Sequence, residues 1–255
     1  EDPTEPPRSG PYPHPAVPDE PAIRDLRARL GKAGVHPASL PLALDIDAWL
    51  RRGQTGWDAF PNTGGAGKID AEVGPLADAL AHPNVTLLTG AQVIGLETDP
   101  AGGQVVAALV RRDGRTQRLT ARHFAVAAGA VQSAALLLRS ANAAHPKGLG
   151  NRSDQLGRNF MNHNTSAMIT LNPFIRNDSV YQKTLCFNDF YNDDAGAGAP
   201  LGNVQLLGRI TGNILKAQVP GLPRPLARAI ASRAFGWFLT SEDLPNPDSR
   251  VLVRG

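Results

Sequence analysis

Cysteine, long apolar runs and dense charge are all scarce in this chain of 255 residues. Cys186 is the only cysteine, which excludes an intrachain disulfide and any multi-cysteine metal site. No window of about 18 consecutive apolar residues occurs, so no transmembrane helix is expected. The net charge is only +3, and no dense Lys/Arg block is interleaved with aromatic residues. This charge pattern argues against a nucleic-acid partner.

The bulk composition is that of a folded globular protein, with 42% hydrophobic and 19% charged residues. The chain starts at Glu1 and shows neither an initiator methionine nor a basic-then-apolar leader. We therefore expect an internal piece of a longer protein. The sparing use of cysteine is compatible with a reducing compartment, and a cytoplasmic location is the expectation.

Residues 1–67 are expected to form a proline-rich arm, a short helix and a loop. Eight prolines fall within residues 1–21, and proline fixes φ and lacks a donor, so this arm is predicted to be extended. The helix follows Pro21, with apolar residues at helical spacing, Ile23, Leu26 and Leu30. Gly53–Gly67 is predicted to be a loop. Its end, GGAGK, is no phosphate-binding loop, because Asn62 and Ile69 stand where that motif needs a glycine and a Ser or Thr.

Residues 68–145 alternate between helical and strand patterns. Apolar spacing predicts a helix after Lys68, through Ile69, Val73, Leu76 and Leu80. Strands are predicted at 85–88, 93–97, 105–111, 116–120 and 124–128, with a hairpin turn at Asp113-Gly114. A helix resumes at Ser133–Leu138 after Gly129.

The stretch Phe124–Ser140 therefore has the order strand, glycine turn, helix, which forms a ligand-binding edge in many α/β proteins. Small residues at such a turn can also serve strand-to-helix packing alone, and the pattern by itself leaves both interpretations open. No Gly-x-Gly-x-x-Gly follows a strand anywhere in the chain, so the pyrophosphate-binding half of a dinucleotide fold is not expected within these residues.

Several segments resemble the glucose-methanol-choline (GMC) oxidoreductase family of flavoenzymes. The similar segments are NVTLLTGAQVIGLETD (Asn84–Asp99), AAGAVQSAALLLRSA (Ala127–Ala141), SDQLGRNFMNH (Ser153–His163) and DLPNPDSRVLV (Asp243–Val253). The elements EDPTEPPRSGPYP (Glu1–Pro13) and QKTL..NDFY (Gln182–Tyr191) place the chain nearest a bacterial group of this family.

The resemblance implies a fold and a chemistry. The fold is α/β, or α+β overall: residues 68–145 form the second part of an FAD-binding Rossmann-like domain with a β-meander, and residues 146–255 form part of an antiparallel-sheet substrate domain. The implied reaction transfers hydride from the CH–OH group of an alcohol or sugar-like donor to flavin. Val93 is implied to lie beside the adenine, while Ala128 and Gly129 let the chain approach FAD closely. The catalytic histidine is expected downstream of Gly255, so no catalytic residue is assigned.

The chain also departs from the family pattern. Ala134 and Ala141 stand where the family usually has proline and glycine, and the loop with Gly53, Gly56 and Asn62 lacks cysteines found in related proteins. Two alternatives therefore stay open, a flavoprotein reductase of another class and a non-catalytic flavin-fold remnant. The expected partners are a small-molecule alcohol and an unknown electron acceptor, and membrane association is not favoured.

Other candidate residues are interpreted as structural. His163 has polar neighbours but lies in a segment expected to join two domains, and no histidine pair has metal-ligand spacing. Asp189, Asp193 and Asp194 precede glycines and favour a solvated loop over a cation site. Ser133 lacks a hydrolase motif, and Cys186 lies in an apolar context. No metal site is expected.

Residues 146–255 are predicted to begin with a polar crossover and continue with short strands at 167–171, 184–187 and 204–207. The apolar spacing of Leu226–Leu239 predicts an amphipathic helix whose wetter side carries Arg228 and Arg233. Such a helix can bind a membrane surface, but packing against the domain is the favoured interpretation.

Overall fold

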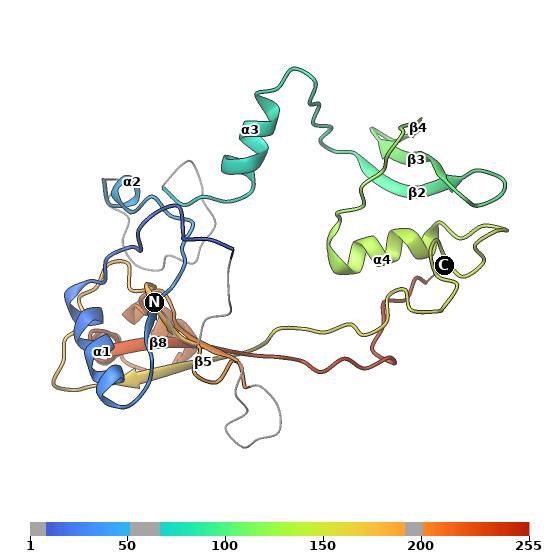
Figure 1. Cartoon of the computed structure of the whole chain (residues 1–255). Coiled ribbons are helices and arrows are strands. Elements are labelled where there is room, and N and C mark those ends of the chain that lie inside the picture. The colour runs from blue at the N-terminus through green and yellow to red at the C-terminus, as the bar shows by residue number, and fades with distance from the viewer. Residues whose placement is uncertain (1–8, 52–66, 192–200, 255) are drawn as a thin grey trace. The chain divides into compact units, whose positions relative to one another are not determined.

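The computed structural model describes residues 9–51, 67–191 and 201–254, which fall into two compact units (Figure 1). Unit 1 comprises residues 1–82 and 163–242, and unit 2 comprises residues 83–162 and 243–255. Each unit thus combines two separate stretches of the chain. The functional division into residues 1–67, 68–145 and 146–255 stays a prediction.

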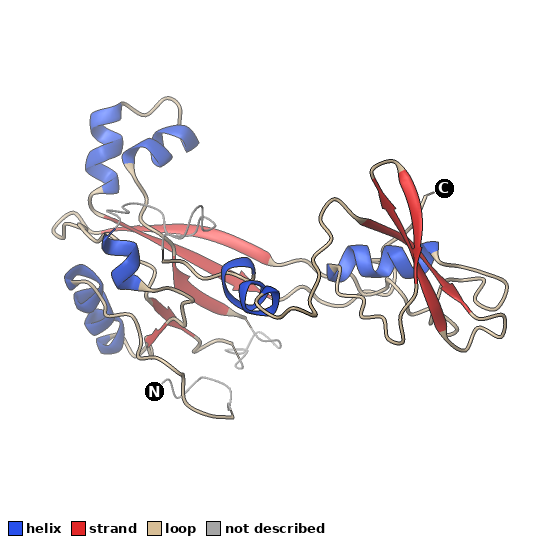
Figure 2. Ribbon diagram, turned by 90° about the horizontal axis from the view of Figure 1, so that it is seen from above, coloured by secondary structure: helices blue, strands red, loops and turns tan. Residues whose placement is uncertain are grey.

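Unit 2 is built on an antiparallel meander of three strands, β2 (Gln92–Thr98), β3 (Val105–Arg112) and β4 (Arg115–Leu119). The turn between β3 and β4 places Asp113 and Gly114 at φ 50° and 72°, as a two-residue hairpin with this sequence predicts. Helix α4 (Gly129–Arg139) lies against the sheet (Figure 2). The core between them contains Leu96, Ala108, Val110, Leu136 and Leu149.

Two strand predictions in unit 2 are wrong. Residues 85–88 and Phe124–Ala128 form no strand, and most of their side chains are exposed. Both are apolar runs with the composition of buried strands, but a strand needs a neighbouring backbone to accept and donate hydrogen bonds. The meander pairs only with itself, so neither run finds such a neighbour among the described residues.

Unit 1 contains a five-stranded antiparallel sheet in the order β1-β6-β7-β8-β5. Its strands are β1 (Ala38–Ser39), β5 (Asn164–Leu171), β6 (Leu185–Phe187), β7 (Asn203–Leu206) and β8 (Ala234–Ser241). The helix predicted after Pro21 is confirmed as α1 (Pro21–Lys32), and it packs Ile23 against one face of the sheet, beside Leu206 and Trp237.

The helix predicted at Leu226–Leu239 is only half right. Helix α6 (Arg224–Ala231) follows α5 (Gly212–Gln218), but residues from Ala234 onward form strand β8. The sequence AFGWFLTS is rich in aromatic residues, which are common in strands. Strand β8 pairs with β7 along one edge and with β5 along the other. Tertiary pairing therefore overrides the helical spacing of the apolar residues.

The remaining helical segments of unit 1 are short. They are α2 (Ile46–Arg51), η1 (Glu72–Leu76) and α3 (Ala77–Leu80), and the last two together form the helix predicted after Lys68. Pro75 lies inside it, next to a non-helical Gly74. No helix in the described ranges is both long and apolar enough to cross a membrane.

The described part of the proline-rich arm, residues 9–20, contains neither helix nor strand, as its prolines predict. Its end is fixed by carboxylates. Glu20 accepts hydrogen bonds from the backbone N–H groups of Val180 and Tyr181 at 2.6 and 2.9 Å, and Asp19 accepts one from the Thr184 hydroxyl at 2.6 Å. The loop prediction for Gly53–Gly67 falls almost wholly on residues outside the described ranges.

Candidate cofactor-binding site

A cavity of about 570 Å³ lies in unit 2 between the meander and the start of α4. Its lining is mostly apolar and small, and it includes two of the three residues expected to contact a cofactor, Val93 and Ala128. The other lining residues are Ala91, Gln92, Leu96, Ala108, Phe124, Ala125, Val126, Ala127, Gln132, Leu136 and Arg139. The cavity lining therefore combines apolar residues with two amides and one cation, and it includes no carboxylate.

Val93 reaches this cavity from strand β2. Its partner across the sheet is Val110, and the register shifts between Val93 and Gly95, which marks a β-bulge. Bulges re-aim side chains next to ligand sites in many sheets. Val93 is 43% exposed and lines the cavity.

Gly129 begins α4 beside the cavity. Its φ of +79° lies in the left-handed region, which glycine adopts without the strain that a Cβ brings. A Cβ built on Gly129 would have no atom within 4 Å, so the chain presents open space on this side. The preceding Ala128 N–H donates a 3.0 Å hydrogen bond to Ser133 Oγ, which fixes the turn into the helix.

Ser140, at the other end of α4, is a supporting residue that the sequence patterns did not single out. Its buried hydroxyl donates to the Leu136 carbonyl at 2.7 Å and accepts the Leu96 N–H of β2 at 2.9 Å. Strand β2 lies at the edge of the meander, and this hydrogen bond joins helix to strand. This contact keeps both walls of the cavity together.

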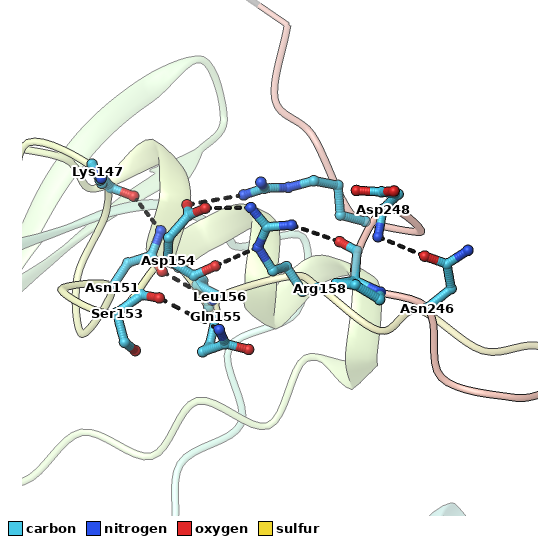
Figure 3. Close-up of polar contacts among 11 residues, drawn as sticks. Lys147, Asn151, Ser153, Asp154, Gln155, Leu156, Arg158, Asn246 and Asp248 are labelled. Atoms are coloured by element: carbon cyan, nitrogen blue, oxygen red, sulfur yellow. Dashed lines mark hydrogen bonds and ion pairs between the residues drawn. The ribbon is translucent and has the colours of Figure 1, made fainter.

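A second polar cluster in unit 2 is the Arg158 clamp, formed by Asp154, Arg158 and Arg250. Figure 3 shows Asp154 and Arg158 of this clamp. Arg158 binds the Asp154 carboxylate and donates to the Pro247 carbonyl at 2.7 Å, while Arg250 lies 3.4 Å from the other Asp154 oxygen. The clamp therefore ties the segment after residue 150 to the segment after residue 243.

The two guanidinium groups also set the charge state of Asp154. Hydrogen bonds from Arg158, and then from Arg250, lower the pKa of this carboxyl from 3.8 to about 2. Backbone bonds run beside the clamp, from Val251 N–H to the Gly157 carbonyl at 2.8 Å and from Phe160 N–H to the Ser249 carbonyl at 2.9 Å.

The residues interpreted as structural occupy unremarkable positions. His163 is exposed next to the start of β5, and Asp189 binds the ring and backbone nitrogens of His36. Cys186 is buried in β6. Asp193 and Asp194 lie outside the described ranges, and no group of three potential metal ligands occurs within those ranges.

Comparison with known proteins points to one family. Residues 51–165 match the sequence model of the GMC oxidoreductases, a stretch that contains the meander, the cavity and α4. Over these residues the chain is similar to the GMC oxidoreductases. The structure combines helices with antiparallel sheets, which is the expected fold class.

Relatives of this chain include named bacterial enzymes. It is 35% identical to 6'''-hydroxyparomomycin C oxidase of Streptomyces lividus over 70% of its length and 35% of the relative's. It is 38% identical to paromamine 6'-oxidase of Streptomyces fradiae over 56% of its length and 27% of the relative's. A shorter match, 34% identical over 30% of this chain and 14% of the relative, is to the fructose dehydrogenase large subunit of Gluconobacter japonicus. The chain thus spans about a third of the length of the first of these relatives and less of the others.

Proposed function

We propose that this chain is the central part of an FAD-dependent oxidoreductase that takes hydride from the CH–OH group of an alcohol or sugar-like donor. The observation that carries the proposal is the cavity lined by Val93 and Ala128, with the left-handed Gly129 next to Ala128 in the chain. The names of the relatives, two oxidases and a dehydrogenase, support the reaction class.

The cavity lining fits part of a flavin dinucleotide. An aromatic base needs a flat apolar wall with a few hydrogen-bonding groups at its rim, and Val93, Phe124 and Ala127 offer the wall. The amides of Gln92 and Gln132 offer the polar groups, and Arg139 supplies a positive charge suited to a phosphate-bearing ligand. When bound, FAD supplies the hydride acceptor.

The roles of this chain's own residues are binding and positioning. Gly129 leaves room for close approach of a ligand to the helix start, and the first turn of α4 has no side-chain cap on its N–H groups. Ser140 holds α4 against β2, which keeps the cavity walls in register. A base that accepts the hydroxyl proton of the donor is not assigned among the described residues.

The test is the FAD content of the full-length protein that contains this chain, with and without the substitution Gly129→Leu. We expect the unmodified full-length protein to retain FAD through a desalting column, measured by visible absorbance, and the variant to retain roughly tenfold less, because leucine fills the approach and strains the backbone.

Gly114→Leu is the matched control. Gly114 also has a left-handed φ, of +72°, and open space around its Cβ position, but it lies in the β3–β4 turn away from the cavity lining. It should carry the same backbone strain and keep its FAD. Equal retention by both variants would contradict the proposed role of Gly129, and a folded full-length protein without FAD would contradict the proposed site.

A further inference from the structure

We infer that helix α6 and the turn after β5 dock unit 1 onto an anionic membrane surface, with Phe174 and Leu226 entering the lipid interface and Arg233 contacting the headgroups. The docking face is defined by four residues, Phe174, Leu226, Ala229 and Arg233. This inference does not rest on the proposed flavin site.

Phe174 protrudes from a tight turn that follows β5. It is 95% exposed, the largest fraction among the large apolar residues that the structure describes. The turn is held in shape, because Asn172 Oδ1 accepts the Phe174 N–H at 3.0 Å and the Asn172 carbonyl accepts the Ile175 N–H at 3.2 Å. Apolar surface left in water contributes nothing to folding, so this fixed ring is available to a partner.

Helix α6 buries one side and exposes the other. Ala227 and Ala231 are buried, whereas Leu226 is 49% exposed and Ala229 is exposed as well. Leu226 and Ala229 are three residues apart, which places them on the same side of the helix. The sequence favoured packing of this helix against the domain, and that interpretation describes only its buried side.

Arg233, just beyond the end of α6, joins the helix to the Phe174 turn. Its Nε donates to the Pro173 carbonyl at 3.2 Å, and its own carbonyl accepts the Asn172 N–H at 3.2 Å. The Arg233 side chain stays exposed. These two hydrogen bonds therefore hold a protruding aromatic residue and an arginine together, although the two lie 59 positions apart in the sequence.

The segments around the docking face carry positive charge only. Residues 164–176 and 203–241 contain five arginines and one lysine, and neither aspartate nor glutamate. The acidic residues that follow these segments are Asp178 and Glu242. Anionic headgroups attract such a cationic surface, and apolar side chains that reach the acyl boundary strengthen the attachment.

The shape of the face favours a bilayer over a protein partner. Protein interfaces seat their anchor side chains in complementary pockets, within a patch of about 800 Å² on each partner. Phe174 instead stands out from a turn. Lipids rearrange around a protruding ring, so a bilayer accepts it without a preformed pocket.

The test is co-sedimentation of the full-length protein with vesicles made of equal parts phosphatidylglycerol and phosphatidylcholine. We expect binding that weakens as the salt concentration rises. Phe174→Ala should weaken binding roughly fivefold to tenfold, because the inserted ring is lost. Arg233→Gln should weaken it about fivefold, because one headgroup attraction is lost.

Two variants serve as controls. Arg233→Lys keeps the positive charge and should bind the vesicles as the unmodified protein does. Leu244→Ala removes an apolar side chain of unit 2 that is 72% exposed but follows Asp243, and it should leave binding unchanged.

Four outcomes would overturn the inference. They are no vesicle binding by the folded protein, equal binding to vesicles of phosphatidylcholine alone, unchanged binding in both the Phe174→Ala and Arg233→Gln variants, and loss of binding in the Leu244→Ala variant. Self-association without vesicle binding, abolished by Phe174→Ala, would also overturn it and assign the face to a second copy of the protein. FAD content is measured separately, so a failure here leaves the proposed function untouched.

Discussion

At the scale of single residues, several non-glycine residues of unit 2 have a left-handed backbone conformation, and they lie in turns and bends. Asp113, Asp154 and Asn159 have φ between 50° and 56°, a region that only Asn, Asp and Gly visit readily. Asp113 closes a hairpin and Asp154 starts the Arg158 clamp. The sequence predicted the hairpin because Asp-Gly is a local signal, but the clamp depends on Arg250, which lies 96 residues away from Asp154.

The Arg158 clamp makes stability depend on pH in the acid range. Because the folded pKa of Asp154 is lowered from 3.8 to about 2, the ionised carboxylate stabilises the fold fully above about pH 4. That contribution is lost as the pH falls towards 2. Asp154→Asn should therefore lower the urea midpoint at neutral pH, with the difference from the unmodified chain shrinking below pH 4.

Asp113→Asn is the control for this experiment. Asparagine tolerates left-handed φ as well as aspartate does, so neither variant strains the backbone. The Asp113 side chain is 90% exposed and its distance to Arg112 is 3.8 Å, which makes a weak surface pair. A pH profile that is the same for both variants would refute a special role for the clamp.

At the scale of elements, local sequence signals predicted most of the helices and strands. Pairing with a neighbouring strand decided the rest. The α1 helix, the β2–β4 meander and the strands β5, β6 and β7 of the unit 1 sheet follow from spacing and turn residues. Phe124–Ala128 and the second half of Leu226–Leu239 were predicted wrongly, because a strand exists only where another strand meets it. One run lacks such a neighbour, and the other gains two.

The junction of α4 with β2 predicts a stability effect at Ser140. Ser140→Ala leaves the Leu96 N–H buried without an acceptor, which should lower the free energy of unfolding by about 1–3 kcal/mol. Ser133→Ala, at the exposed end of the same helix, should cost under about 1 kcal/mol because water replaces the lost acceptor. Urea denaturation followed by circular dichroism measures both, and equal losses would argue against the Ser140 junction.

At the scale of the whole molecule, neither unit is continuous in sequence. The candidate cofactor residues Val93, Ala128 and Gly129 could be proposed from short motifs, because strand, turn and helix follow one another closely. The pairing of Ala38 in β1 with Cys186 in β6 could not be, since residues so far apart in sequence are joined only by strand register. The carboxylates of Asp19 and Glu20 are similar, because their partners lie about 160 residues further along.

Substitution of Glu20 tests how much these long-range hydrogen bonds stabilise unit 1. Glu20→Ala removes the acceptor of the Val180 and Tyr181 N–H groups and should destabilise unit 1 by about 2–3 kcal/mol. Asp25→Ala, in the exposed Asp25–Arg29 pair of the following helix, should cost under about 1 kcal/mol.

Tryptophan fluorescence is the measurement, because Trp49 and Trp237 are both buried in unit 1. A Glu20 variant that unfolds at the same urea concentration as the Asp25 variant would show that the arm contributes nothing.

The discontinuity of unit 1 has a consequence during synthesis on the ribosome. Strand β1 pairs with β6, whose residues emerge about 150 positions later, and at roughly 5–20 residues per second the wait is on the order of ten to thirty seconds. During that interval Ile23 and the rest of the α1 face have no sheet to cover them. A nascent chain of this design is therefore a natural client for chaperones that hold exposed apolar helices, and slower translation would lengthen its exposure.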